Sequence, residues 1–259
     1  MRHWSEPATP VHIAGNIYFV GTNELAMYLF PSPAGHILLD SGFEESVPVV
    51  KANVERLGYR FEDIKILLAS HAHADHVGGH ALVKKLTGAR VVAMAEDAPL
   101  LRAGGGGPLA LDMTWAPVVP DQVIHDGAVI ELGGTKLVAH LTGGHTPGAT
   151  TWTTTVQDAG RSLAVVFFSS ATLFDEVPLK DNPAYSTIAD DLTRSYAFWH
   201  AVPCDIFLAP HGSFFDLDAK RTRALRGETP NPFIDPTGWK KLIDAQEAIF
   251  RRRLAAANR

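Results

Sequence analysis

Three histidines and one aspartate lie within six consecutive residues of this chain. The segment reads Ser70-His71-Ala72-His73-Ala74-Asp75-His76 and directly follows the apolar run at residues 64–68. Imidazole nitrogens and carboxylate oxygens are the ligands that divalent metals such as zinc prefer. One ion rarely takes four ligands from so short a loop. The spacing therefore predicts two metals, each taking two ligands here and one from elsewhere in the chain.

Two isolated histidines fit the remaining ligand positions. His145 lies in Gly143-Gly144-His145-Thr146-Pro147-Gly148, directly after a predicted strand, where the glycines allow close approach of the backbone. His211 follows Pro210 at the end of another predicted strand. Either residue alone would more often be an ordinary surface histidine, and the neighbouring cluster is what makes both of them metal-ligand candidates.

The elements that must position these side chains are short apolar strands alternating with amphipathic helices. Gly133-Gly134 predicts a hairpin, and Gly104-Gly105-Gly106-Gly107-Pro108 predicts a mobile loop that runs to about residue 120. Both halves of the chain run strands first and a helix later, which predicts two packed sheets with helices outside. Strands are predicted at 17–20, 27–30, 36–40, 64–69, 90–94, 128–132, 136–140, 151–155, 163–168 and 206–209, and helices at 48–57, 79–86, 188–199 and 237–257.

Composition limits the class of protein. The 259 residues are 46% hydrophobic, which is enough for one large α/β domain or two modest ones. The sequence shows no linker, so we expect a single domain over residues 1–259 with an N-terminal arm at 1–12. The net charge of −5 is spread along the chain, which argues against nucleic-acid and membrane partners. The single Cys204 cannot form an internal disulfide and is expected to be a buried small hydrophobe.

No apolar targeting segment is visible in residues 1–10, and no run approaches the roughly 18 apolar residues of a membrane span. We therefore expect a periplasmic location if a signal peptide has been removed, and a cytoplasmic one otherwise. The sequence does not fix the oligomeric state.

Several motifs together resemble the metallo-β-lactamase superfamily and, within it, the subclass B3 metallo-β-lactamases. The His-rich segment is typical of the superfamily, whereas the full set is typical of the subclass, and the similarity extends from about Trp4 to the C-terminal helix. The motifs are Leu38-Leu39-Asp40-Ser41-Gly42, Leu68 to His76, Gly144-His145-Thr146-Pro147-Gly148-Ala149-Thr150-Thr151-Trp152, Asp191 to Tyr196, Pro203-Cys204-Asp205 and Leu208-Ala209-Pro210-His211.

The resemblance implies a four-layer αββα sandwich with two Zn²⁺ ions at one sheet edge. By position, the first zinc would be held by His71, His73 and His145, and the second by Asp75, His76 and His211. Three protein ligands per zinc leave room for water or substrate, which is typical of catalytic rather than structural sites.

One position separates subclass B3 from its relatives. Glyoxalase II-type hydrolases and many lactonases of the superfamily carry a metal-bridging Asp after the strand at 163–168, and another lactamase subclass has a Cys there. This chain reads Phe168-Ser169-Ser170-Ala171-Thr172. The subclass typically has a Ser that orients a zinc-bound water, and Ser170 fits best by strand length. A slip of one residue would put Ala171 there, and ordinary loop hydrogen bonding is the alternative for Ser169 and Ser170.

The resemblance implies hydrolysis of the β-lactam amide of penicillins, cephalosporins and carbapenems by a di-zinc-bound hydroxide, and hence antibiotic resistance. Asp75 would serve as ligand and proton acceptor. Thr172 and Trp115 are candidate substrate contacts, although Trp115 is nearly as well explained by packing under its own loop. Asp40 is a candidate partner for a ligating imidazole, with a purely structural role as the alternative.

Two other functions remain open from the sequence. A lactonase or another ester or amide hydrolase would use the same fold, and the missing bridging carboxylate argues against it. A non-catalytic metal-binding or nucleic-acid-processing protein is the second alternative, and the mildly acidic charge and the absence of a basic groove argue against nucleic acid.

Overall fold

The first of two sheets carries the His-rich segment. In the computed structural model, which describes residues 2–257, seven strands lie in the order β1-β2-β3-β4-β5-β6-β7. Pairing is antiparallel from β1 to β4 and parallel from β4 to β7. The strands are β1 Val11–Ala14, β2 Ile17–Phe19, β3 Tyr28–Phe30, β4 His36–Leu39, β5 Ile64–Leu68, β6 Arg90–Met94 and β7 Gln122–Ile124.

The second sheet has five strands in the order β12-β11-β10-β9-β8, all antiparallel except the β11–β12 pair. The predicted hairpin at Gly133-Gly134 is confirmed, since both glycines have positive φ and Leu132 pairs with Thr135. The strands are β8 Val129–Leu132, β9 Thr135–Leu141, β10 Thr150–Asp158, β11 Arg161–Phe167 and β12 Ile206–Leu208.

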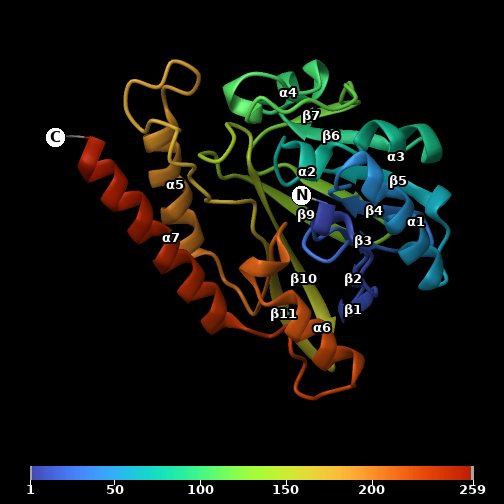
Figure 1. Cartoon of the computed structure of the whole chain (residues 1–259). Coiled ribbons are helices and arrows are strands. Elements are labelled where there is room, and N and C mark those ends of the chain that lie inside the picture. Colours follow the sequence, from blue (N-terminus) through green and yellow to red (C-terminus); the bar gives the residue numbers. More distant parts are fainter. Residues whose placement is uncertain (1, 258–259) are drawn as a thin grey trace.

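Helices cover the outer faces of both sheets, so the predicted four-layer αββα arrangement is confirmed. Figure 1 shows α5 and α7 on one side of the molecule and α1 and α3 on the other, with the strands between them. The helices are α1 Val47–Arg56, α2 Ala74–Val77, α3 His80–Thr87, α4 Ala98–Ala103, α5 Ile188–Ala201, α6 Leu217–Leu225 and α7 Pro236–Ala257.

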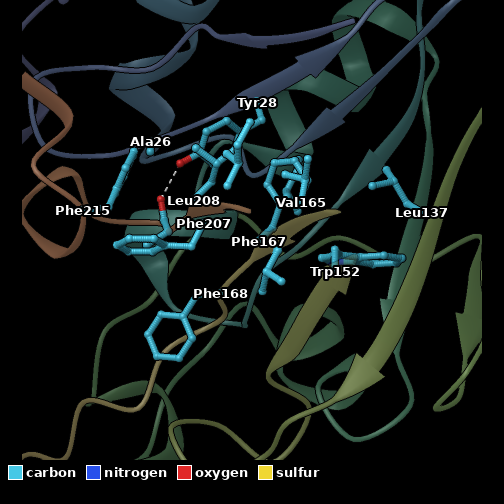
Figure 2. Packing of buried hydrophobic residues seen from close by; sticks show 14 of the residues in the cluster. Ala26, Tyr28, Leu137, Trp152, Val165, Phe167, Phe168, Phe207, Leu208 and Phe215 are labelled. Atoms are coloured by element: carbon cyan, nitrogen blue, oxygen red, sulfur yellow. Dashed lines mark hydrogen bonds between the residues drawn. The ribbon is translucent and has the colours of Figure 1, made fainter. Parts of the chain in front are cut away.

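A large aromatic core fills the space between the sheets. Tyr28 of β3 meets Phe167 of β11 edge to face with ring centroids 5.1 Å apart, and Trp152 of β10 is also fully buried (Figure 2). A second apolar cluster lies under α1 and α3 on the outer face of the first sheet, with Val50, Val54 and Val83 among its members. Burying both faces explains why the inner strands are nearly continuous apolar runs.

Several elements differ from the predictions. Residues 11–12 belong to β1, so the arm is shorter than predicted, because Val11 and Ile13 supply a period-two strand pattern at its end. The short elements β7, α4 and α6 were not predicted. The loop after α4 contains a 3-10 turn at Pro108–Ala110 and folds back on itself, since Gly106 N–H donates to Met113 O at 2.8 Å.

Four strand ends meet at one edge of the sandwich. The chain leaves β5 into the His-rich segment, β9 into the His145 loop, β11 into Ser169 and Ser170, and β12 into Pro210 and His211. A 2.7 Å hydrogen bond from Thr150 N–H to Ser70 O joins the two sheets there. None of the described helices is both long enough and apolar enough to cross a lipid bilayer.

Candidate metal centre

His71, His73 and His145 form the first ligand group. One ring nitrogen from each lies within 4.8 Å of the others, and the ring centroids are 4.6–5.0 Å apart. His71 and His73 follow β5, and His145 follows β9 of the other sheet. The structure thus brings together the three residues that the sequence assigns to one metal.

Backbone carbonyls fix the tautomers of two of these imidazoles. His145 Nδ1 lies 2.7 Å from Thr172 O, and His73 Nε2 lies 3.1 Å from Leu109 O. A carbonyl oxygen only accepts hydrogen bonds, so each of these nitrogens carries the proton. The opposite nitrogens, Nε2 of His145 and Nδ1 of His73, therefore keep free lone pairs.

A short relay orients His71. Its Nδ1 lies 3.2 Å from Ser70 Oγ, which donates to Asp40 Oδ2 at 2.7 Å. The other oxygen of Asp40 accepts Ser70 N–H at 2.7 Å. His71 Nε2 is buried and has no hydrogen-bond partner among the described residues. Asp40 therefore acts on His71 through Ser70, as expected for a carboxylate that orients a ligand.

Asp75, His76 and His211 form the second ligand group. Asp75 Oδ2 lies 3.2 Å from His76 Nε2 and 3.3 Å from His211 Nε2. His76 Nε2 is buried, without a well-formed hydrogen bond inside the described chain. One carboxylate oxygen and two imidazole nitrogens thus converge on one point.

Two outer carboxylates support this group. Asp40 Oδ2 lies 3.6 Å from His76 Nδ1, so Asp40 faces both ligand groups. Glu24 Oε1 lies 3.5 Å from His211 Nδ1 and accepts a 2.6 Å hydrogen bond from Ser213 Oγ. Glu24 was not identified from the sequence. It lies in a turn between strands and carries no local signal, and only the pairing of Leu25 with His211 brings it here.

Burial keeps the first group neutral. Removal from water lowers the pKa of His73 to about 4 and lowers the pKa of His71 and His145 well below 6.5. Burial opposes ionisation of Asp75, but the His76 charge and the hydrogen bonds from His211 and His76 lower its pKa. The first group thus offers neutral imidazoles and Asp75 offers a carboxylate, the forms in which these side chains bind metals.

The donor sets fit two zinc ions. Buried imidazole nitrogens without partners are unfavourable unless something binds them. His71 Nε2 is such an atom, and His76 Nε2 meets only Asp75, a carboxylate of its own ligand group. Sets of His₃ and AspHis₂ contain the nitrogen and oxygen ligands of catalytic zinc sites.

Asp97 connects the two ligand loops of the first group and was missed by the sequence reasoning. Its Oδ2 accepts Ala72 N–H at 2.9 Å and Thr146 Oγ–H at 2.7 Å, and its Oδ1 accepts Gly148 N–H at 2.7 Å. Burial raises its pKa to about 6, against the effect of these three donors. Its position three residues beyond β6, in the line of parallel strand ends, was the available signal.

A cleft of about 330 Å³ opens beside the two ligand groups. Ser170 and Thr172 line it, and Ser170 Oγ accepts Thr172 N–H at 3.2 Å. Ser169 instead points into the core, where its hydroxyl contacts Thr142 Oγ at 2.9 Å. The other residues that line the cleft are Trp4, Glu24, Phe43, His73, Asp75, Leu111, Met113, His145, Phe174, His211, Ser213 and Phe214.

The structure does not bring Trp115 into the described wall of the cleft. The indole packs under its own loop, so close to Gly105 that a Cβ there would lie 2.4 Å from Trp115 Cζ3. Leu111 and Met113 of the same loop line the cleft instead. The Trp4 ring lies edge-on to His211 with centroids 5.2 Å apart and lines the cleft, so the N-terminal arm borders it.

Comparison with known proteins agrees with this geometry. Residues 14–156 match the sequence profile of the metallo-beta-lactamase superfamily. The native FEZ-1 metallo-beta-lactamase from Legionella gormanii is 42% identical with a TM-score of 0.95, and the match covers 98% of both chains. BJP-1, a subclass B3 enzyme of Bradyrhizobium japonicum, is 36% identical with a TM-score of 0.92 over 100% of this chain and 98% of its own.

Two further matches have lower sequence identity to this chain. LRA-12, a class B3 di-zinc metallo-beta-lactamase from an Alaskan soil metagenome, is 32% identical with a TM-score of 0.91 over 98% of this chain and 97% of its own. A metal-dependent hydrolase of Pyrococcus furiosus is 33% identical over 34% of this chain, and the match spans only 36% of that protein. The full-length matches carry the assignment: the chain belongs to the metallo-beta-lactamase superfamily and to its subclass B3.

Proposed function

We propose that this protein is a zinc-dependent β-lactamase that binds two zinc ions. The first is held by His71, His73 and His145, and the second by Asp75, His76 and His211. The observation that carries the proposal is that both ligand groups contribute side chains to the lining of one cleft, which is large enough for a small bicyclic substrate. When bound, zinc ions at this centre supply Lewis acidity and a hydroxide nucleophile at neutral pH.

The chain's own residues would position substrate and move protons. Ser170 Oγ accepts Thr172 N–H, so its hydroxyl hydrogen is left to donate to the attacking water. Asp75 lines the cleft and contacts both histidines of its group through Oδ2. We propose that this carboxylate accepts the proton of the attacking water, with Thr172 as a contact for the substrate.

The test combines a zinc count with turnover. Elemental analysis of the purified protein should find two zinc ions per chain, and nitrocefin should be hydrolysed. His211→Ala should bind one zinc ion fewer and lose activity by at least about 10³-fold, because the second group is left with two ligands. His125→Ala is the matched control, since His125 is exposed and belongs to neither group.

Two results would contradict the proposal. Full nitrocefin turnover with one zinc missing would exclude the two-metal version. Turnover of a homoserine lactone in place of nitrocefin would favour the alternative hydrolase. At the end of β11 the chain reads Phe168-Ser169-Ser170, so no carboxylate stands where a lactonase-type bridging ligand is expected.

We further propose a periplasmic location and a role in antibiotic resistance. A β-lactamase protects a bacterium when it meets the drug before the drug reaches its target. Expression behind a secretion signal in a susceptible Gram-negative host should raise the inhibitory concentration of a penicillin, whereas the secreted His211→Ala variant should not. Equal resistance from both proteins would contradict the role.

A further inference from the structure

We propose that Arg253 on helix α7 is a positioning residue that holds one wall of the active-site cleft and thereby sets the affinity for substrate. The inference rests on the proposed β-lactamase function and adds a specificity-determining residue to it. Arg253 lies far from the His-rich segment in sequence, and it is absent from the residues that line the cleft.

The segment from Thr172 to Val177 forms the wall in question. Thr172 O accepts the hydrogen bond from His145 Nδ1 at 2.7 Å, which fixes the start of the segment to a metal-ligand candidate. The Phe174 ring lies over His145 with centroids 5.8 Å apart, borders the cleft and is 37% exposed. A half-exposed ring on a loop moves readily unless its backbone is held.

Arg253 fixes the backbone of this segment through hydrogen bonds to its carbonyls. Its Nη1 donates to Phe174 O at 2.9 Å, and its Nη2 donates to Val177 O at 2.7 Å and to Asp175 O at 3.4 Å. Phe174 O also accepts Val177 N–H at 3.0 Å, so the guanidinium stabilises a turn that already has a backbone hydrogen bond. A planar, permanently charged fork suits this task, since it reaches separate carbonyls with a fixed geometry.

Helix α7 is packed against the core, so the backbone of Arg253 is fixed in place. Phe250, one helical turn before Arg253, is 3% exposed and stacks on Tyr196 of α5 with centroids 5.5 Å apart. Trp239 and Ile243 of the same helix are buried in the same apolar cluster as Phe250. Arg253 therefore connects the Phe174 turn to the core of the second sheet.

The experiment compares Arg253→Gln with Arg252→Gln in the zinc-loaded full chain. Arg252 is the exposed neighbour on the same helix and serves as the matched control. In Arg253→Gln, hydrogen exchange of amides 173–177 should accelerate at least about tenfold with unchanged zinc content, because the turn loses its charge-assisted bonds. KM for nitrocefin should rise about tenfold with kcat within about twofold, which is the signature of lost substrate binding.

Two further variants separate positioning from general stability. Arg253→Lys should recover only part of the KM, because an ammonium cannot reach both carbonyls with fixed geometry. Phe174→Ala should raise KM similarly, and the double variant should be no worse than either single one, because both changes remove the same wall. Additive effects would show that Arg253 does not act through Phe174.

The outcomes also separate this inference from the proposed function. Unchanged exchange at 173–177 and unchanged KM in a folded Arg253→Gln protein would overturn the role of Arg253. If the wild-type protein hydrolysed no β-lactam, the proposed function and the effect on affinity would both fail. The exchange measurement would still decide whether Arg253 holds the turn.

Discussion

Asp97 Oδ2 accepts a 2.7 Å hydrogen bond from Thr146 Oγ, next to the candidate ligand His145. The same carboxylate accepts the N–H of Ala72, which lies between the other two candidate ligands of the group. One buried side chain thus sets the distance between two loops from different sheets. Such outer contacts decide how closely ligands approach the geometry that a metal needs.

Asp97→Asn should therefore weaken zinc binding. The amide of asparagine keeps one acceptor oxygen, but its NH₂ group is a donor. In one orientation this NH₂ would face Gly148 N–H, and in the other it would face Ala72 N–H and Thr146 Oγ, which are donors as well. We expect zinc affinity to fall about 10- to 100-fold. Competition with a chromophoric chelator measures it. Glu96→Gln, at the exposed neighbouring position, should change affinity less than about twofold, and equal losses in both variants would contradict the role of Asp97.

Two adjacent glycines of the cleft loop should respond differently to the same substitution. Gly105 and Gly106 have φ of 78° and 82°, so an alanine at either costs about 1–2 kcal/mol of backbone strain. At Gly105 the new Cβ would also lie 2.5 Å from Met113 O, whereas at Gly106 no atom lies within 4 Å.

Gly105→Ala should thus displace the loop that carries Leu111 and Met113 into the cleft wall. We expect a rise of about fivefold or more in KM for nitrocefin, against less than about twofold for Gly106→Ala. Steady-state kinetics of the two variants measures the difference. Equal KM values would show that the crowding at Gly105 is relieved without moving the wall.

His80 should make stability depend on pH in acid. Burial lowers its pKa to about 3 from an ordinary value of 6.5, and its Nδ1 contacts Ser41 Oγ at 2.7 Å. The unfolded chain gains a proton at His80 below pH 6.5 while the folded chain does not. The stability that neutral His80 contributes is therefore complete above pH 6.5 and is lost as the pH falls toward 3.

His80→Phe should remove this dependence. In the metal-free protein, the slope of unfolding free energy between pH 6 and pH 5 should fall by up to about 1.4 kcal/mol per pH unit, the equivalent of one proton. Urea denaturation at several pH values measures the slope. Replacement of the exposed His125 should leave it unchanged, and an unaltered slope in His80→Phe would contradict the assignment.

Trp152 should stabilise the start of the His-rich segment as well as the core. It is 1% exposed, and its Nε1–H donates to Ala69 O at 2.9 Å. Trp152→Phe leaves a cavity and removes the donor to that carbonyl, so we expect a loss of about 2–4 kcal/mol in unfolding free energy.

Trp239→Phe is a suitable comparison. Trp239 is also buried, at 6% exposure, and its ring contacts Phe168 and Phe207 in the core. The change in ring size is the same, and the loss should be about 1 kcal/mol smaller because Trp239 makes no hydrogen bond from Nε1 to a described residue. Denaturant titration of both variants measures the difference, and equal losses would show that the Trp152 hydrogen bond contributes nothing.

Much of the fold was predictable because the strands are apolar runs that end at turn residues. The segment at 64–68 became β5, and Gly133-Gly134 became the β8–β9 turn. The strand β7 was missed because Gln122–Ile124 is only three residues long and begins with a polar residue. Helix α4 has six residues, which leaves too few turns for a periodic pattern, and α6 buries only Leu217 and Lys220, so it lacks an apolar stripe.

The sequence by itself determined which side chains can bind metal, because imidazoles and carboxylates concentrated at strand ends leave few alternatives. Tertiary structure decided how each side chain is aimed. The Leu109 carbonyl leaves Nδ1 of His73 free, whereas the Thr172 carbonyl leaves Nε2 of His145 free. Tertiary structure also turned Trp115 under its loop and brought Arg253 to the Phe174 turn. These contacts join residues far apart in the chain, so their geometry exists only once the two sheets have packed together.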